Sequence, residues 1–190
     1  MGCLPSEIEG SETIVRVVKS PFHLNKTKRA LTPRAFHPPR QGSGRELSVI
    51  RQLMGDDFCK NKGRDMLSGN PPARYIGLAS GLVEVVRSFG AGVEDVPEDF
   101  EGHAHVVSMI PHPPADEPHP PATMLALDAY YRNMLEHFDY QADPSPEEDG
   151  WKGRALARKS ELDVEGEEPH AEVGPASVEV SPQPPDDTPS

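Results

Sequence analysis

Two histidines separated by a single residue, His103 and His105, most directly suggest chemistry in this sequence. They open the stretch HAHVVSMI at 103–110, which is predicted to be a β-strand. Because residues two apart on a strand face the same way, both imidazoles are expected to project together. Neutral imidazoles are common zinc ligands, and a catalytic zinc site also needs a third ligand and an open position. A zinc site at this histidine pair is therefore one expectation.

The proline-rich segment that follows leaves two further interpretations open. Residues 111–121 contain six prolines, and His112, Asp116, Glu117 and His119 lie among them. Prolines favour an extended polyproline II segment, which could dock on an aromatic groove of a partner or could simply connect two elements. In the second case the histidine pair is structural and is hydrogen-bonded to the backbone or to a neighbour such as Glu101.

Charge is divided unevenly along the chain, whose net charge is -12. Residues 12–80 hold thirteen Lys/Arg against five Asp/Glu (+8), whereas residues 81–190 hold six against twenty-four (-18). The basic segment predicts an anion-accepting face for a phosphate-bearing ligand or nucleic acid, and the alternative is that the acidic half neutralises it. The candidate anion-binding residues are Lys26, Lys28, Arg29, Arg34 and Arg51.

Polar residues within otherwise apolar strands suggest a shared cleft. If the predicted strands converge, His23, Ser48, His103 and His105 line it, with Arg34 beside them. Imidazoles next to a guanidinium suit a phosphate or nucleotide ligand. No catalytic residue can be assigned from the sequence.

The predicted fold class is α+β, with a small mixed or antiparallel sheet and two main helices. A strand is expected within 11–20, and residues 46–54 are ambiguous, with Ser48–Ile50 favouring a short strand. Apolar spacing predicts helices over 74–89, with Gly90 at the position after the C-cap, and over 123–140, with Thr123 as the N-cap. The stretches 21–45 and 55–73 are predicted to be loops and turns.

The domain organisation follows from composition. Residues 12–142 are expected to form one compact domain, after a flexible N-terminus at 1–11 and before a loosely attached segment at 143–160. Residues 161–190 carry nine acids, six prolines and no Lys or Arg, so they are predicted to be a disordered acidic tail.

Features that would place the protein outside the cytoplasm are missing from the sequence. No apolar run is long enough to span a membrane, there is no secretory signal pattern, and the two cysteines are too few for a disulfide framework. The opening MGCLPS matches the pattern for acylation at Gly2, with Cys3 as a second acceptor, but no basic cluster adjoins it. A cytoplasmic protein without a membrane partner is expected.

Several short motifs together resemble a group of small uncharacterised bacterial proteins. They are FHLN (22–25), LTPRAF (31–36), ELSVI (46–50), VRSFGAGV (86–93) and EGHAHV (101–106), and they cover about half of the chain. The resemblance implies a bacterial setting, in defence or gene-conflict neighbourhoods, and carries no known activity.

These observations favour a non-enzymatic binding protein, an accessory subunit of a larger protein partner, with a basic anion-accepting face. The alternative is a nucleotide- or phosphoester-processing enzyme that uses the histidine-lined cleft and depends on zinc. The sequence leaves open whether the protein is an enzyme.

Overall fold

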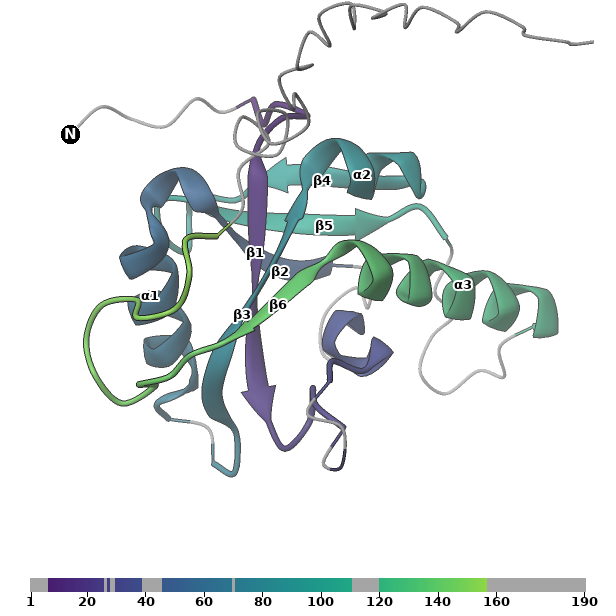
Figure 1. The fold of residues 1–190 in the computed structure, drawn as a ribbon. Coiled ribbons are helices and arrows are strands. Elements are labelled where there is room, and N and C mark those ends of the chain that lie inside the picture. The colour runs from purple at the N-terminus through teal and green to yellow at the C-terminus, as the bar shows by residue number, and fades with distance from the viewer. Residues whose placement is uncertain are drawn as a thin grey trace, which may run out of the picture.

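The fold is α+β and is built on a six-stranded antiparallel sheet (Figure 1). The computed structural model describes residues 7–25, 27, 30–38, 46–69, 71–110 and 120–156. Within this part of the chain the strand order is β4-β5-β2-β1-β3-β6. The strands are β1 (Thr13–Ser20), β2 (Glu46–Arg51), β3 (Arg74–Leu82), β4 (Ala91–Asp95), β5 (His103–Ser108) and β6 (Asp139–Ala142). The helices are α1 (Asp56–Leu67), α2 (Val83–Ser88) and α3 (Pro121–His137), with short 3-10 turns η1 (Pro33–Phe36) and η2 (Gln52–Met54).

The sheet has an apolar core on each face. The α3-side core joins residues of α3, such as Leu127 and Met134, to Ile14 and Val18 of β1 and to Phe36 of η1. The α1-side core joins Cys59 of α1 to Val15, Val17 and Ile50. Alternate residues of β1 thus enter opposite cores, as expected for a strand buried on both faces. This alternation decides on which side of the sheet each polar side chain lies.

Three of the strands and the long helix were predicted from the sequence, and the structure confirms them. Strands β1, β2 and β5 lie within the expected stretches. Helix α3 buries most of its predicted apolar stripe, although Met124 is 50% exposed. It begins at Pro121, and its N-cap is Pro120 rather than Thr123. The expected ion pair between Asp128 and Arg132 is present at 3.0 Å.

The helix predicted over 74–89 is wrong for most of its length. Residues 74–82 form β3, and only residues 83–88 are helical. Strand β3 is buried on both faces, so its apolar residues do not alternate and their spacing mimics a helix. Gly90 does follow the C-cap of α2, with φ of 79°.

The turns predicted over 55–73 are also wrong, because this stretch contains the twelve-residue helix α1. The residues that α1 buries are Cys59, Lys60 and Gly63, which do not form an apolar stripe. A Cβ added at Gly63 would lie 2.9 Å from Val17 Cγ2, so the absence of a side chain lets α1 pack directly on β1.

The compact unit extends further than the predicted boundaries at both ends of the described chain. Ile8 is 3% exposed, and its carbonyl accepts a hydrogen bond from Arg87 of α2 at 2.8 Å. The segment 143–156, here called the C-terminal strap, packs on α1 and buries Leu156 in the α1-side core. Residues 1–6 and the predicted acidic tail lie outside the described residues.

Substitution of Gly81 with alanine is expected to destabilise the protein by about 1–3 kcal/mol, because the new methyl overpacks the core. A Cβ at this position would lie 2.7 Å from the Phe138 ring, closer than van der Waals contact allows. Gly92 of β4 is the matched control, since the nearest atoms to an added Cβ lie 4.0 Å away. Urea unfolding of both variants checks this, and a Gly92→Ala variant as unstable as Gly81→Ala would contradict it.

Candidate functional site

The predicted histidine pair lies on the α1 side of the sheet, beside Ser48 of β2. His103 and His105 of β5 are cross-strand partners of Ile50 and Ser48, and Ile50 belongs to the α1-side core. Cross-strand partners share a face, which brings these polar side chains together. The two imidazole centroids are 4.8 Å apart, and His103 Nε2 is 2.7 Å from Ser48 Oγ. This part of the predicted cleft is present.

A third side chain, Asp99, completes a cluster of possible metal ligands. One ligand atom from each of Asp99, His103 and His105 lies within 4.8 Å of the others. Asp99 Oδ2 is 3.0 Å from His103 Nδ1. His103 is buried, with 3% of its surface exposed, whereas the side chain of Asp99 is 65% exposed. Among the described residues, these three could hold a metal ion.

Among the described residues, the buried side chain of His103 has one ring nitrogen with a partner and one without a hydrogen bond. Its ring stacks on Phe100, with centroids 4.7 Å apart, and Ser48 Oγ accounts for Nε2. In the described part of the chain, buried Nδ1 has no hydrogen-bond partner, although Asp99 lies at a suitable distance. The separation of 3.0 Å from Asp99 Oδ2 is short enough for a hydrogen bond, but its direction is not suitable. Nδ1 is therefore a buried polar atom without a hydrogen bond.

Burial is the main reason why the protonated form of His103 is disfavoured. Burial lowers its pKa below the usual value, and His105 lowers it further, whereas Asp99, a backbone contact with Val96 and Asp95 act in the opposite direction. Because a metal binds the unprotonated ring, the neutral form is the one suited to coordination.

The other residues of the predicted cleft, His23 and Arg34, lie on the opposite face. They adjoin Arg16, which sits on β1 between Val15 and Val17 and therefore points away from the α1-side core. Arg16 donates to the carbonyl of Ala35 at 3.0 Å, next to the α3-side core. The structure thus separates the single cleft expected from the sequence into two sites.

Arg51 does not fit the predicted anion-binding role. Its side chain is 0% exposed and forms ion pairs with Glu12 at 2.8 Å and Asp95 at 3.1 Å. These carboxylates neutralise the guanidinium inside the protein, where a ligand has no access to it. The predicted residues Lys26, Lys28 and Arg29 lie outside the described residues.

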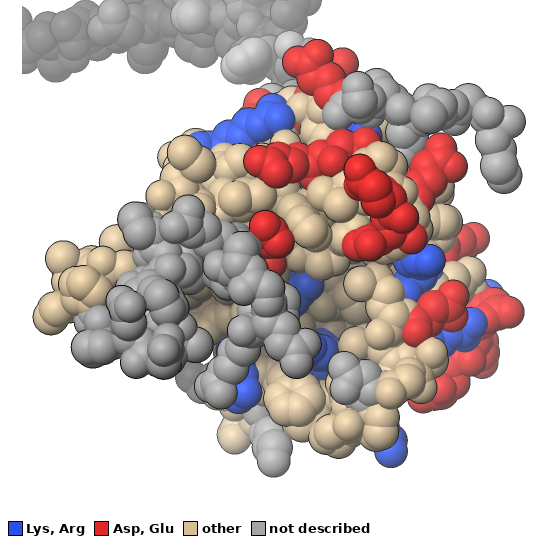
Figure 2. Space-filling model, turned by 180° about the vertical axis from the view of Figure 1, so that it is seen from behind, with Lys and Arg blue, Asp and Glu red and all other residues tan. Residues whose placement is uncertain are grey.

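The surface is not uniformly basic. On the side shown in Figure 2, Asp and Glu form the larger coloured area, and Lys and Arg atoms are scattered. The visible described residues on this side therefore do not form a continuous basic face.

Sequence reasoning missed Asp99 as a ligand. It precedes the strand in the turn that leads from β4 to β5, four residues before His103. The polar residues noted near the histidine pair were instead those that follow the strand, namely His112, Asp116, Glu117 and His119. These lie outside the described residues. The sequence feature that could have indicated Asp99 is the short stretch DFEGH at 99–103. A tight turn there can bring the carboxylate back to the first residue of the strand, His103.

Comparison with known proteins found no matching family model, no significantly similar curated protein and no significantly similar solved structure. In the described part of the chain, no helix combines the length and apolar character that crossing a membrane requires. Function is therefore inferred from the geometry of the two sites.

Proposed function

We propose that this protein binds a divalent metal ion, most suitably zinc, through Asp99, His103 and His105. The observation that carries the proposal is the buried Nδ1 of His103, which lacks a hydrogen bond while a carboxylate oxygen lies 3.0 Å away. Zinc bonds of about 2.0–2.2 Å place two tetrahedral ligand atoms about 3.3–3.6 Å apart, slightly wider than this separation. Two imidazoles and a carboxylate are also a ligand set that zinc uses.

The surroundings of His103 fit a metal ligand. A ligating imidazole commonly donates its other N–H to a neighbouring polar group, which fixes the ring and its tautomer. Ser48 Oγ is placed to accept that bond from Nε2 at 2.7 Å, which leaves Nδ1 for the metal. Asp99 is exposed, so its carboxylate can move to close the remaining distance to His105.

The same side chains also have the order of a Ser–His–Asp triad, with Ser48 on one ring nitrogen of His103 and Asp99 near the other. In such a triad the Nδ1–H donates a hydrogen bond to the carboxylate. That bond is missing among the described residues, which favours metal binding.

Three protein ligands leave a coordination position for water or substrate, as in catalytic zinc sites. Zinc bound there would supply a Lewis acid and lower the pKa of a bound water. This chemistry supports the alternative of a phosphoester-processing enzyme over a purely accessory role. A cytoplasmic location, a larger protein partner and a bacterial defence setting stay predictions from the sequence.

Zinc titration of the chelator-treated full-length protein tests the proposal. We expect one zinc ion per chain, and an affinity loss of at least about a hundredfold for Asp99→Asn and His105→Gln, since loss of second-shell partners alone costs about 10–100-fold. These two residues are more exposed than His103, so their variants should fold. Isothermal titration calorimetry gives the affinity, and cobalt absorption gives a spectroscopic signature of the ligand set.

His137→Gln is the matched control, because His137 is an exposed histidine on α3 whose Nδ1 contacts the carbonyl of Asn133 at 2.9 Å. Its zinc affinity should equal that of the wild type. Zinc binding that survives both Asp99→Asn and His105→Gln would place the ion elsewhere. Labelling of Ser48 by a fluorophosphonate in metal-free protein would instead support the triad.

A further inference from the structure

At the C-terminal end of β1, we propose that Lys19 and Arg34, held beside Phe22, bind the phosphate group of a small ligand. The ring of Phe22, which follows β1, has Lys19 Nζ at 5.9 Å and Arg34 Cζ at 5.6 Å from its centroid. Lys19 and Phe22 are half-buried and Arg34 is exposed, so both cationic groups reach the surface.

Neither cation of this site is neutralised in the part of the chain that the structure describes. The salt bridges there involve other Lys and Arg residues, including the buried Arg51 and Lys60. Lys19 and Arg34 instead rest against one aromatic ring. A cation–π contact orients a cation without cancelling its charge, so less side-chain entropy is lost when an anion binds.

Arg16 adds a third positive charge beneath the surface. Its guanidinium donates to Ala35 O at 3.0 Å and to Ser48 O at 2.8 Å, which fixes its position. Burial lowers the pKa of Arg16 to about 10, so the side chain stays charged at neutral pH. Both of these acceptors are neutral carbonyls, which leave the net charge of the guanidinium in place.

The pKa of the neighbouring His23 is affected by these positive charges. His23 is 4% exposed, and burial, followed by the charges of Arg16, Lys19 and Arg34, lowers its pKa to about 3. No carboxylate is among the groups that act on it. Among the described residues, three positive charges therefore lie around His23 with no carboxylate acting on it, and together with burial they disfavour its protonation.

The chemistry of the ligand follows from these groups. A guanidinium fork and an ammonium group are the donors with which proteins recognise phosphate, and three positive charges match a multiply charged oxyanion better than a single carboxylate. A small ligand is favoured over nucleic acid because the whole chain carries a net charge of -12, which repels a polyanion.

Titration of inorganic pyrophosphate into chelator-treated, full-length protein tests the site without interference from a bound metal. We expect Lys19→Gln and Arg34→Gln each to weaken binding about tenfold, the loss of one charge-assisted contact. Phe22→Leu keeps an apolar side chain but removes the cation–π contacts, and it should weaken binding about threefold. Calorimetry measures the affinities, and circular dichroism verifies folding of each variant.

Lys152→Gln is the matched control, because Lys152 is an exposed lysine in the C-terminal strap. Its affinity for pyrophosphate should equal that of the wild type. Bound pyrophosphate should also raise the pKa of His23 in an NMR titration. Absence of binding, or equal losses from Lys152→Gln and Arg34→Gln, would overturn the proposal, and neither result bears on the zinc site.

Discussion

Replacement of Lys60 with methionine is expected to lower the free energy of unfolding by about 3–5 kcal/mol, the cost of leaving one member of a buried ion pair alone. Lys60 Nζ lies 3.0 Å from Asp143 Oδ2, and both side chains are 0% exposed. Lys60 also donates to Ser145 O at 2.8 Å. Methionine would fill most of the space but leave the Asp143 carboxylate buried without its cation. Urea unfolding measures the loss.

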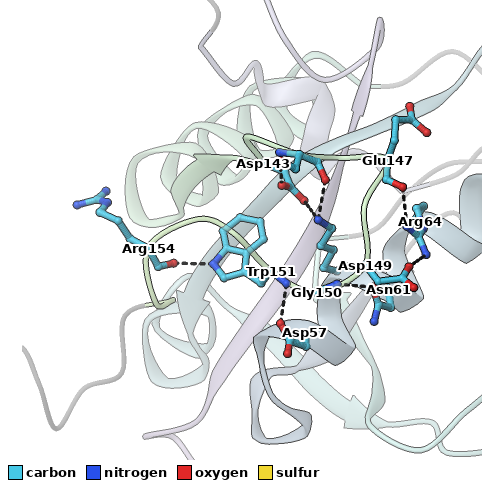
Figure 3. Close-up of polar contacts among 11 residues, drawn as sticks. Asp57, Asn61, Arg64, Asp143, Glu147, Asp149, Gly150, Trp151 and Arg154 are labelled. Carbon is cyan, nitrogen blue, oxygen red and sulfur yellow. Dashed lines mark hydrogen bonds and ion pairs between the residues drawn. The ribbon is translucent and has the colours of Figure 1, made fainter.

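The exposed pair between Arg64 and Asp149 is the matched control, because it also ties α1 to the C-terminal strap (Figure 3). Asp149 is 85% exposed, so Arg64→Gln should cost far less stability than Lys60→Met. The double variant Lys60→Met, Asp143→Leu should recover part of the loss, since it removes both buried charges. If Lys60→Met cost no more than Arg64→Gln, the pair would not stabilise the strap.

Further contacts explain why the strap belongs to the fold. The backbone N–H of Trp151 donates to Asp57 at 2.6 Å, and that of Gly150 donates to Asn61 at 3.3 Å (Figure 3). The N–H of Leu156 donates to Asp56 at 3.1 Å. Polar residues of α1 thus satisfy the strap backbone, whereas the sequence shows only an acidic, proline-containing stretch that resembles a linker.

Two of the elements that the sequence predicted correctly, β1 and α3, carry a clear apolar pattern. In β1, β-branched residues dominate, and in α3 the apolar residues recur at helical spacing. The failures have the opposite property. Strand β3 is apolar on both faces, and α1 buries Cys59, Lys60 and Gly63, so neither shows the periodicity of its own structure.

Local sequence rules also predicted part of the candidate site. The two-residue spacing of His103 and His105 correctly placed both rings together, since it depends only on the geometry of one strand. The fate of Arg51 depends on Glu12 and Asp95, which are 39 and 44 positions away in sequence. Such pairings arise from strand order, and a charge pattern alone does not contain them.

The stability of the protein is expected to fall as the pH is lowered through the range in which histidine titrates, and His23 is the main described cause. Its pKa is about 3 in the folded protein, against an ordinary value of 6.5. Between these values the unfolded state binds a proton that the folded state excludes, so the contribution of His23 is complete above pH 6.5 and lost towards pH 3. The total is up to about 5 kcal/mol, of which about 2 kcal/mol is lost between about pH 7 and pH 5.

His23→Asn isolates this contribution. The asparagine carbonyl can accept the hydrogen bond that the N–H of Lys19 donates to His23 Nδ1 at 3.3 Å, but it does not titrate. The pKa of His103 is also lowered, so the wild type and the variant share that part of the pH dependence. Urea unfolding between pH 7 and pH 5 should give a shallower slope for the variant. Equal slopes would mean that burial and the charges of Arg16, Lys19 and Arg34 together do not exclude the proton, and the positive potential that supports the phosphate site would be absent as well.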